Sequence, residues 1–288
     1  MSVLNGRGIL VTGGSLGIGQ AVALACIKAG AHVAICARNP GDLEAAKSAL
    51  QDSASKHQRV LAKPVDVSLP AAVSALIEWL REEAFPLTGL VNAAGILGPA
   101  GALDEVSIDQ WIATIQVNLI GTMLLCRAVL PLFRRQGYGK IVNFSGGGAT
   151  SPRPRFSAYA ASKTAIVRLT ENLAKEEEEN GVRVNAIAPG AVNTRMLDEV
   201  LNAGAAHVGE SAYQDALRQQ QSGGAPAARA ADLCIMLLGP TSDAITGRLL
   251  SAVWDPWPSL AAHAQDLKTT DIYTLRRIVP TDRGLSWE

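Results

Sequence analysis

The feature that most constrains this chain is a glycine-rich turn between two apolar segments near its N-terminus. The turn, Thr12–Gly19, follows the apolar run Gly8–Val11 and precedes the helix-forming run Gln20–Lys28. A buried strand, a glycine turn and a helix in this order predict an anion site, because the free N–H groups at a helix start favour a pyrophosphate. We therefore expect a dinucleotide to bind here. The residues expected to hold it are Gly13, Ser15, Leu16, Gly17, Ile18 and Gly19.

Part of the same turn also fits a different motif. Gly13–Gly17 matches G-x-S-x-G, the nucleophile elbow of α/β-hydrolases, in which Ser15 would be the nucleophile. His263 lies far enough downstream to complete a Ser–Asp–His order. That elbow normally follows several strands of its sheet, whereas this turn follows the first. A hydrolase is therefore a distant alternative to a dinucleotide site.

Composition excludes several other classes of protein. The chain has 288 residues, 26 Lys and Arg against 26 Asp and Glu, and 48% hydrophobic residues. Zero net charge argues against a nucleic-acid partner, and we find no apolar run suited to a membrane span and no signal-like N-terminus. The four cysteines are scattered and the four histidines show no metal-ligand spacing. We therefore expect a cytoplasmic protein with a sizeable core, buried thiols and no metal.

The residues after the second expected strand, Ala31–Cys36, bear on which dinucleotide is bound. An acidic side chain at this point would accept from the ribose hydroxyls of NAD. The chain instead has Ala37 followed by Arg38. A guanidinium pairs well with a phosphate, so Arg38 favours NADP, with NAD still possible. The alternative is an ordinary solvated arginine.

Two further strand ends are expected at the same edge of the sheet. A strand over Arg59–Val67 ends near Asp66, whose carboxylate could accept from the adenine amino group or serve only in a turn. The apolar run Thr88–Val91 is followed by small residues that could lie flat against a cofactor. The residues expected at the site from these two ends are Asp66, Val67, Asn92, Ala93, Ala94 and Gly95.

A tyrosine and a lysine follow the fifth expected strand, Gly139–Ser145. Tyr159 and Lys163 are four residues apart, so on a helix they share a face. A phenol loses its proton near pH 10, but an adjacent ammonium, like the positive ring of an oxidised nicotinamide, stabilises the phenolate. Such a tyrosine can exchange a proton near neutral pH. Upstream, Asn118 lies within the apolar face of the long helical stretch Ser107–Phe133 and needs buried partners.

The second half of the chain continues the alternation of strands and helices. We expect strands over Val182–Ala188 and Ile245–Ser251 and a helix over Ala227–Leu238. The polar, glutamine-rich stretch that ends at Gly224 could form a lid over a substrate. The four glutamates at 176–179 are interpreted as a solvated helix end.

Taken together, residues 5–253 resemble the short-chain dehydrogenase/reductase family. The matching segments are 12–19, 92–95, Asn118, Tyr159 with Lys163, and Pro189 and Gly190 with Thr194. The resemblance implies an α/β fold, a Rossmann-like three-layer doubly wound parallel sheet of about seven strands. It also implies hydride transfer between NAD(P) and a secondary alcohol or ketone, and a homo-oligomer, either a tetramer or a dimer.

The resemblance also implies the roles of individual residues. Tyr159 would be the general acid or base, and Lys163 would lower its pKa and hold the nicotinamide ribose. Asn118 would support a water in a proton relay. The cofactor would be held by the residues of the loop after the sixth strand, Pro189, Gly190, Val192 and Thr194.

The chain departs from the family pattern at the catalytic serine. That serine usually stands thirteen positions before the tyrosine, which is Gly146 here. We expect Ser145 to take its place by a shift of the glycine-rich loop, with Ser151 or a water as alternatives. Loss of the serine also leaves open a catalytically weak, cofactor-binding regulator.

Two features bear on the substrate. The C-terminal extension 254–288, which includes Trp254 and Trp257, is expected either to pack on its own domain or a neighbouring subunit, or to form a wall of the substrate pocket. Residues 1–253 would then form the catalytic domain. If Arg153, Arg155 and Arg195 converge on the cleft, they favour an anionic substrate. The alternative is that they are ordinary solvated arginines of loops.

Overall fold

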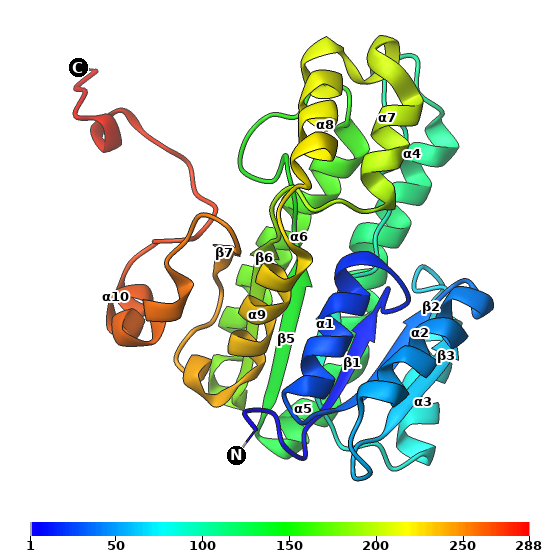
Figure 1. Ribbon diagram of the computed structural model, residues 1–288. Helices are drawn as coiled ribbons and strands as arrows, with labels where there is room; N and C mark the ends of the chain where they lie inside the picture. Colours follow the sequence, from blue (N-terminus) through cyan, green and yellow to red (C-terminus); the bar gives the residue numbers. More distant parts are fainter. Residues whose placement is uncertain (1, 288) are drawn as a thin grey trace.

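The computed structural model, which describes residues 2–287, is built on one seven-stranded sheet with the order β3-β2-β1-β4-β5-β6-β7 (Figure 1). Every neighbouring pair of strands is parallel. The sheet, with helices on both faces, confirms the predicted three-layer doubly wound fold. The strands are β1 (Gly8–Thr12), β2 (His32–Ala37), β3 (Val60–Pro64), β4 (Leu87–Asn92), β5 (Gly139–Phe144), β6 (Val182–Ala188) and β7 (Leu249–Ser251).

Side chains alternate along each strand and so divide the apolar core between the two faces of the sheet. In β1, Ile9 and Val11 pack against one helical layer, whereas Leu10 packs against the other. The first layer contains α1 (Gly17–Lys28), α2 (Pro40–Ser53) and α9 (Ala227–Leu238). The second contains α3 (Pro70–Glu82), α5 (Gly121–Gln136) and α6 (Ser157–Glu176).

The direction of winding reverses between β1 and β4, which are neighbours in the sheet although two strands separate them in sequence. The loops that follow these two strands leave toward opposite faces, so a crevice opens at their carboxyl ends. Ligands of open parallel sheets bind at such a point. The glycine turn follows β1 and therefore lies at this crevice.

The long helical stretch around Asn118 contains an irregularity that the sequence did not predict. It consists of α4 (Ile108–Ile115), a π-helix over Gln116–Ile120 and α5, which run on as one helix. Among the described residues this is the one helix long and apolar enough, by length and composition alone, to cross a membrane. Its α5 part contributes seven buried residues that cover the second face of the sheet. The π-helix contains Asn118, whose contacts with the loop after β4 are described below.

The stretch expected as a lid forms two helices, α7 (Arg195–Val208) and α8 (Glu210–Ser222). They stand above the carboxyl edge of the sheet, beside α4 (Figure 1). Their apolar residues form a third cluster with Leu97, Phe156 and Tyr159. This cluster makes α7 and α8 one wall of a cleft over the sheet.

The C-terminal extension covers the β7 edge of the sheet. Leu260 and Leu267 are buried in the first core cluster, and the N–H of Leu249 donates to the Tyr273 carbonyl at 2.9 Å. The Arg248 guanidinium donates to the carbonyl of Ile272 at 2.7 Å. The extension contains α10 (Ala264–Thr269), and its last segment leaves the body of the molecule (Figure 1). Short 3₁₀ turns lie at Glu178–Asn180, Pro240–Ser242, Trp257–His263 and Pro280–Arg283.

One glutamate of the 176–179 run is not solvated, which corrects the interpretation of that run. The Glu177 side chain has an exposed fraction of 0% and is held by the Arg134 guanidinium and, at 2.9 Å, by the Asn180 amide. The hydrogen bonds from Arg134 lower the pKa of Glu177 below its usual value, more than burial raises it. Glu177 therefore ties the end of α6 to α5.

Candidate functional site

Two adjoining clefts lie at the carboxyl edge of the sheet. The first, which we name the glycine-loop cleft, has a volume of about 600 Å³ and lies between the turn after β1 and the loops after β2, β3 and β4. The second, which we name the tyrosine cleft, has a volume of about 700 Å³ and lies under α7 and α8. Both are lined by Ile18, Thr194 and Met196, so a ligand in one can reach into the other.

Three of the four glycines in the turn, Gly13, Gly14 and Gly19, leave no room for a side chain. Gly13 and Gly17 have φ values of +64° and +55°, which other residues rarely adopt. A Cβ at Gly13 would lie 2.8 Å from the Ala94 Cα, and one at Gly19 would lie 2.2 Å from the Gly13 oxygen. No side chain caps the first turn of α1, which begins at Gly17. The turn therefore fits a pyrophosphate that binds to those N–H groups.

The far end of the glycine-loop cleft contains the residues expected at the adenosine. Arg38 is exposed and lines the cleft, as do Asp66 and Val67. β3 ends earlier than predicted, so Asp66 lies in a turn, where its carboxylate accepts from Ser68 Oγ at 2.6 Å and from the Ser68 N–H at 2.9 Å. Asp66 therefore stabilises the turn and also lines the glycine-loop cleft.

The loop after β4 contributes three of its four expected residues to the glycine-loop cleft. Ala93, Ala94 and Gly95 line it. Asn92 does not: its side chain is 3% exposed and its amide donates to Asn143 Oδ1 at 2.9 Å. This corrects the prediction, and the reason is that Asn92 still belongs to β4 and points between the strands and α5.

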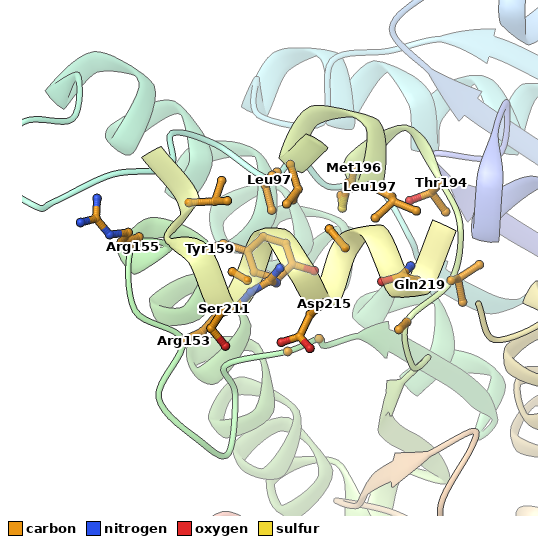
Figure 2. Close-up of a pocket in the computed structure, with 18 of the residues that line it drawn as sticks. Leu97, Arg153, Arg155, Tyr159, Thr194, Met196, Leu197, Ser211, Asp215 and Gln219 are labelled. Atoms are coloured by element: carbon orange, nitrogen blue, oxygen red, sulfur yellow. The ribbon is translucent and has the colours of Figure 1, made fainter. Parts of the chain in front are cut away.

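Tyr159 and Lys163 come together on the first turns of α6. Tyr159 is 8% exposed and lines the tyrosine cleft (Figure 2). Lys163 is buried, its ammonium donates to the Phe144 carbonyl at 2.9 Å, and Nζ lies 5.6 Å from the Tyr159 ring centroid. Burial raises the pKa of Tyr159 and lowers that of Lys163 to about 8. An ammonium with this pKa can release or take a proton near neutral pH.

Asn118 fastens the loop after β4 to α6. Its amide oxygen accepts from the Ile96 N–H at 2.8 Å, and its amide nitrogen donates to the Ile96 carbonyl at 2.9 Å and to Ser162 Oγ at 3.1 Å. A Cβ at Gly95 would lie 3.2 Å from the Asn118 oxygen and 3.5 Å from Lys163 Nζ. Asn118 and Lys163 therefore border the same small space, and the asparagine amide is occupied by the protein.

Ser145 does not reach the cleft, which corrects the prediction for the missing serine. Its hydroxyl donates to the Lys163 carbonyl at 3.2 Å, and the residue is 2% exposed. Ser151 is exposed and lines neither cleft. At the family's serine position, a Cβ on Gly146 would lie 2.6 Å from the Tyr159 hydroxyl oxygen. The phenol thus occupies the space in which a serine side chain would begin.

The loop after β6 borders both clefts. Pro189, Gly190 and Val192 line the tyrosine cleft, and Thr194 lines both. The Thr194 methyl lies 3.3 Å from the place of a Cβ on Gly17. Thr194 is thus where the two clefts join, between the glycine turn and α7.

Two of the three arginines considered for an anionic substrate, Arg153 and Arg155, line the tyrosine cleft, whereas Arg195 lines the glycine-loop cleft. Arg153 lines the tyrosine cleft and lies over the Tyr159 ring, with 5.3 Å from its guanidinium carbon to the ring centroid (Figure 2). Arg155 donates to the carbonyl of Ala206 at 3.3 Å and so fastens its loop to α7. Arg195 pairs with Asp42 at 3.6 Å beside the glycine-loop cleft.

The tyrosine cleft also contains polar residues that sequence reasoning missed. Ser211, Asp215 and Gln219 come from α8 (Figure 2). They lie on the polar face of an amphipathic helix, and such a face is ordinarily solvated, so the sequence carries no signal for them.

The hydrolase alternative finds no support in the arrangement of Ser15 and His263. Ser15 follows β1, whereas His263 lies in the extension beyond β7, and β4, β5 and β6 stand between these strands. His263 is exposed and pairs with Asp266 at 3.3 Å. Within residues 2–287, no three His, Cys, Asp or Glu side chains gather where they could hold a metal ion. The described part of the extension lines neither cleft.

Comparisons with known proteins match most of the chain. The family model for short chain dehydrogenase matches residues 7–204. A short chain dehydrogenase of Pseudocercospora fijiensis is 34% identical over 264 residues, which are 89% of this chain and 83% of that protein. The solved structure of a variant of actinorhodin polyketide ketoreductase with NADPH is 28% identical, with a TM-score of 0.78 over 87% of this chain and 97% of that one. The structure of NAD⁺-bound xylitol dehydrogenase is 26% identical, with a TM-score of 0.78 over 86% of this chain and 98% of that one.

Proposed function

Because this chain belongs to the short-chain dehydrogenase/reductase family, we propose that Tyr159 is the general acid and base of an NADP-preferring oxidoreductase. The chain is an enzyme that transfers a hydride between a nicotinamide dinucleotide and an alcohol or ketone. The observation that carries the proposal is the junction of the two clefts. The anion cradle and the phenol open onto a shared wall, Ile18 and Thr194, so the cofactor and the substrate can meet there.

The cofactor fits the glycine-loop cleft through groups that belong to this chain. The first turn of α1 would hold the pyrophosphate and Thr194 the nicotinamide carboxamide, while Ala93, Ala94 and Gly95 would lie flat beside it. The bound nicotinamide supplies or accepts the hydride. The protein's task is then to align the substrate and to move a proton.

Tyr159 would carry out the proton transfer at the substrate oxygen. In reduction, negative charge builds on that oxygen, and the phenol donates a proton to it; in oxidation, the phenolate accepts a proton from the alcohol. The Lys163 ammonium stabilises the phenolate, and its pKa of about 8 suits it to pass a proton on. Asn118 would support that path by fixing the loop that borders Lys163.

The preference for NADP rests on Arg38. Its guanidinium lines the adenosine end of the cleft, where NAD-specific sites place an acid that would repel a 2′-phosphate. The related structures contain NADPH and NAD⁺, so the family accommodates both. Arg38 would pair with the phosphate that distinguishes them.

We further propose that the substrate that enters the tyrosine cleft is anionic. Arg153 and Arg155 both line that cleft, but the Arg155 guanidinium already donates to the Ala206 carbonyl and Arg195 pairs with Asp42, so Arg153 is the arginine that supports it. A carboxylate or phosphate placed away from the reacting carbon could bind its guanidinium.

The experiment is a fluorescence titration with NADPH, followed by turnover of a panel of neutral and acidic ketones. Saturable binding and turnover are the expected outcome. Binding without turnover on any ketone would favour the cofactor-binding regulator that Gly146 left open. Absence of NADPH and NADH binding would refute the proposal.

A further inference from the structure

The glycines after Ser145 make room for two side chains of the tyrosine cleft. A Cβ at Gly146 would lie 2.6 Å from the Tyr159 hydroxyl, and one at Gly147 would lie 3.6 Å from Arg153 Nη1. A Cβ at Gly148, which has φ +93°, would lie 2.7 Å from the Ala160 Cβ and 3.2 Å from the Arg153 Cβ. The absence of a side chain at the family's serine position thus leaves space for the Tyr159 hydroxyl, and the two glycines that follow lie against Arg153.

Arg153 is fixed over two aromatic rings. Its guanidinium carbon lies 4.3 Å from the Phe156 ring centroid and 5.3 Å from that of Tyr159. Pro152 and Pro154 flank it and restrict the backbone of its loop. Within residues 2–287, no carboxylate oxygen lies within 4.0 Å of its guanidinium. This partly exposed arginine therefore has aromatic rings as its neighbours in place of an acid.

We propose that Arg153 is a positioning residue for the reaction, and that its guanidinium stabilises the phenolate of Tyr159. A cation over an aromatic face is attracted to the ring, and the attraction grows when the ring carries a delocalised negative charge. Tyr159 is 8% exposed, so its ring is screened less by water than a ring at the surface. The proposal rests on the proposed role of Tyr159 as acid and base.

Arg153 and Lys163 are both cations beside the phenol ring, and Arg153 adds to the stabilisation that Lys163 provides. Lys163 lies on the same helix, 5.6 Å from the ring centroid, and its ammonium donates to the Phe144 carbonyl. Glu210 and Asp215 face the cleft from α8, and acids there raise the pKa of a phenol. Burial raises the pKa of Tyr159, and the Arg153 charge opposes that rise. Loss of Arg153 must then move the pKa of Tyr159 upward.

The test is the pH profile of kcat/KM for oxidation of a neutral secondary alcohol by the full-length enzyme. Arg153→Met should move the acidic limb upward by about one pH unit, because an opposite charge within this distance typically lowers a pKa by that much or more. Activity at pH 7 should fall about tenfold, since one pKa unit is a factor of ten in the phenolate fraction. The affinity for NADPH should stay unchanged, and free guanidinium ion should restore part of the activity of Arg153→Ala.

Arg127→Met is the matched control, because this exposed arginine lies on α5 outside both clefts. An unshifted acidic limb in Arg153→Met would overturn the proposal. A raised KM for acidic substrates together with an unshifted acidic limb would leave Arg153 only the anion-binding role and would likewise overturn the proposal. If the Met variant fails to fold, Arg153→Ala decides instead: an acidic limb that matches wild type and does not respond to free guanidinium ion overturns the proposal. Arg153→Lys, which keeps the charge, should retain most of the wild-type profile.

The proposed function and the role of Arg153 can be refuted separately. If Tyr159→Phe keeps its activity, the proposed function fails whatever Arg153 does. If Tyr159→Phe is inactive and Arg153→Met keeps the wild-type acidic limb, only the role of Arg153 fails.

Discussion

Gly146→Ala is the substitution whose cost follows most directly from the geometry of the site. The new Cβ would lie 2.6 Å from the Tyr159 hydroxyl oxygen, which is 0.8 Å short of the 3.4 Å at which ordinary contact begins. Tyr159 is packed against Phe156 and Leu97 in the third core cluster, so the phenol cannot move without disturbing that packing. A displacement on the order of 1 Å at a reacting group costs about a hundredfold in rate. We therefore expect kcat/KM to fall between about tenfold and a hundredfold.

The assay for Gly146→Ala is steady-state reduction of the best ketone from the panel, alongside a titration with NADPH. The affinity for NADPH should not change, because Gly146 lines the tyrosine cleft and not the glycine-loop cleft. Gly147→Ala is the matched control: its Cβ meets Arg153 Nη1 at 3.6 Å, an ordinary contact, and should cost much less. Equal activity of wild type and Gly146→Ala would refute the placement of the phenol. Gly146→Ser, which restores the family residue, carries the same Cβ and meets the same conflict.

Two further predictions concern the cofactor and the extension. Arg38→Ala should weaken NADPH binding by about tenfold or more while NADH binding changes little, because the guanidinium would pair with the 2′-phosphate; equal losses for both dinucleotides in a fluorescence titration would contradict this. A chain ending at Ser251 should lose on the order of 3 kcal/mol or more of unfolding free energy, because Leu260 and Leu267 leave the core. A chain ending at Leu275, which keeps those leucines, should unfold in urea close to wild type, and equal destabilisation of both chains would contradict the packing described here.

Elements with a strong local pattern were predicted almost residue by residue. β6 at Val182–Ala188 and α9 at Ala227–Leu238 have the predicted bounds. An apolar run bounded by glycine or proline and a 3.6-residue period suffice to define such elements. β3 and β7 are shorter than predicted, since the apolar residues near their ends continue into loops that leave the sheet.

The features that the sequence could not define depend on contacts between distant segments. The burial of Glu177 depends on Arg134, 43 residues away, and a run of glutamates gives no sign of it. The direction of the Ser145 hydroxyl is set by the end of β5, where side chains alternate between faces, and it points to α6. The π-helix around Asn118 is a change of hydrogen-bond partner that leaves the apolar period nearly intact.

The position of Arg153 over the Tyr159 ring could not be predicted from the sequence for the same reason. The sequence marks an arginine between two prolines in a loop, but its neighbours come from the glycine run after β5 and from α6. Residue types and spacing predicted that the phenol and the ammonium lie close together, whereas the arginine beside the ring depends on how distant segments fold together.

The role of Tyr159 as the general acid and base is tested most directly by kcat/KM of Tyr159→Phe with a ketone that the wild-type enzyme reduces. The affinity of the same variant for NADPH is measured beside it. Phenylalanine keeps the ring that packs in the third cluster and removes only the hydroxyl. The account predicts an unchanged affinity for NADPH and a loss of kcat/KM on the order of a hundredfold to ten-thousandfold, the usual contribution of a general acid. A variant that binds NADPH and still reduces the ketone within a fewfold of wild type would show that the proton comes from elsewhere.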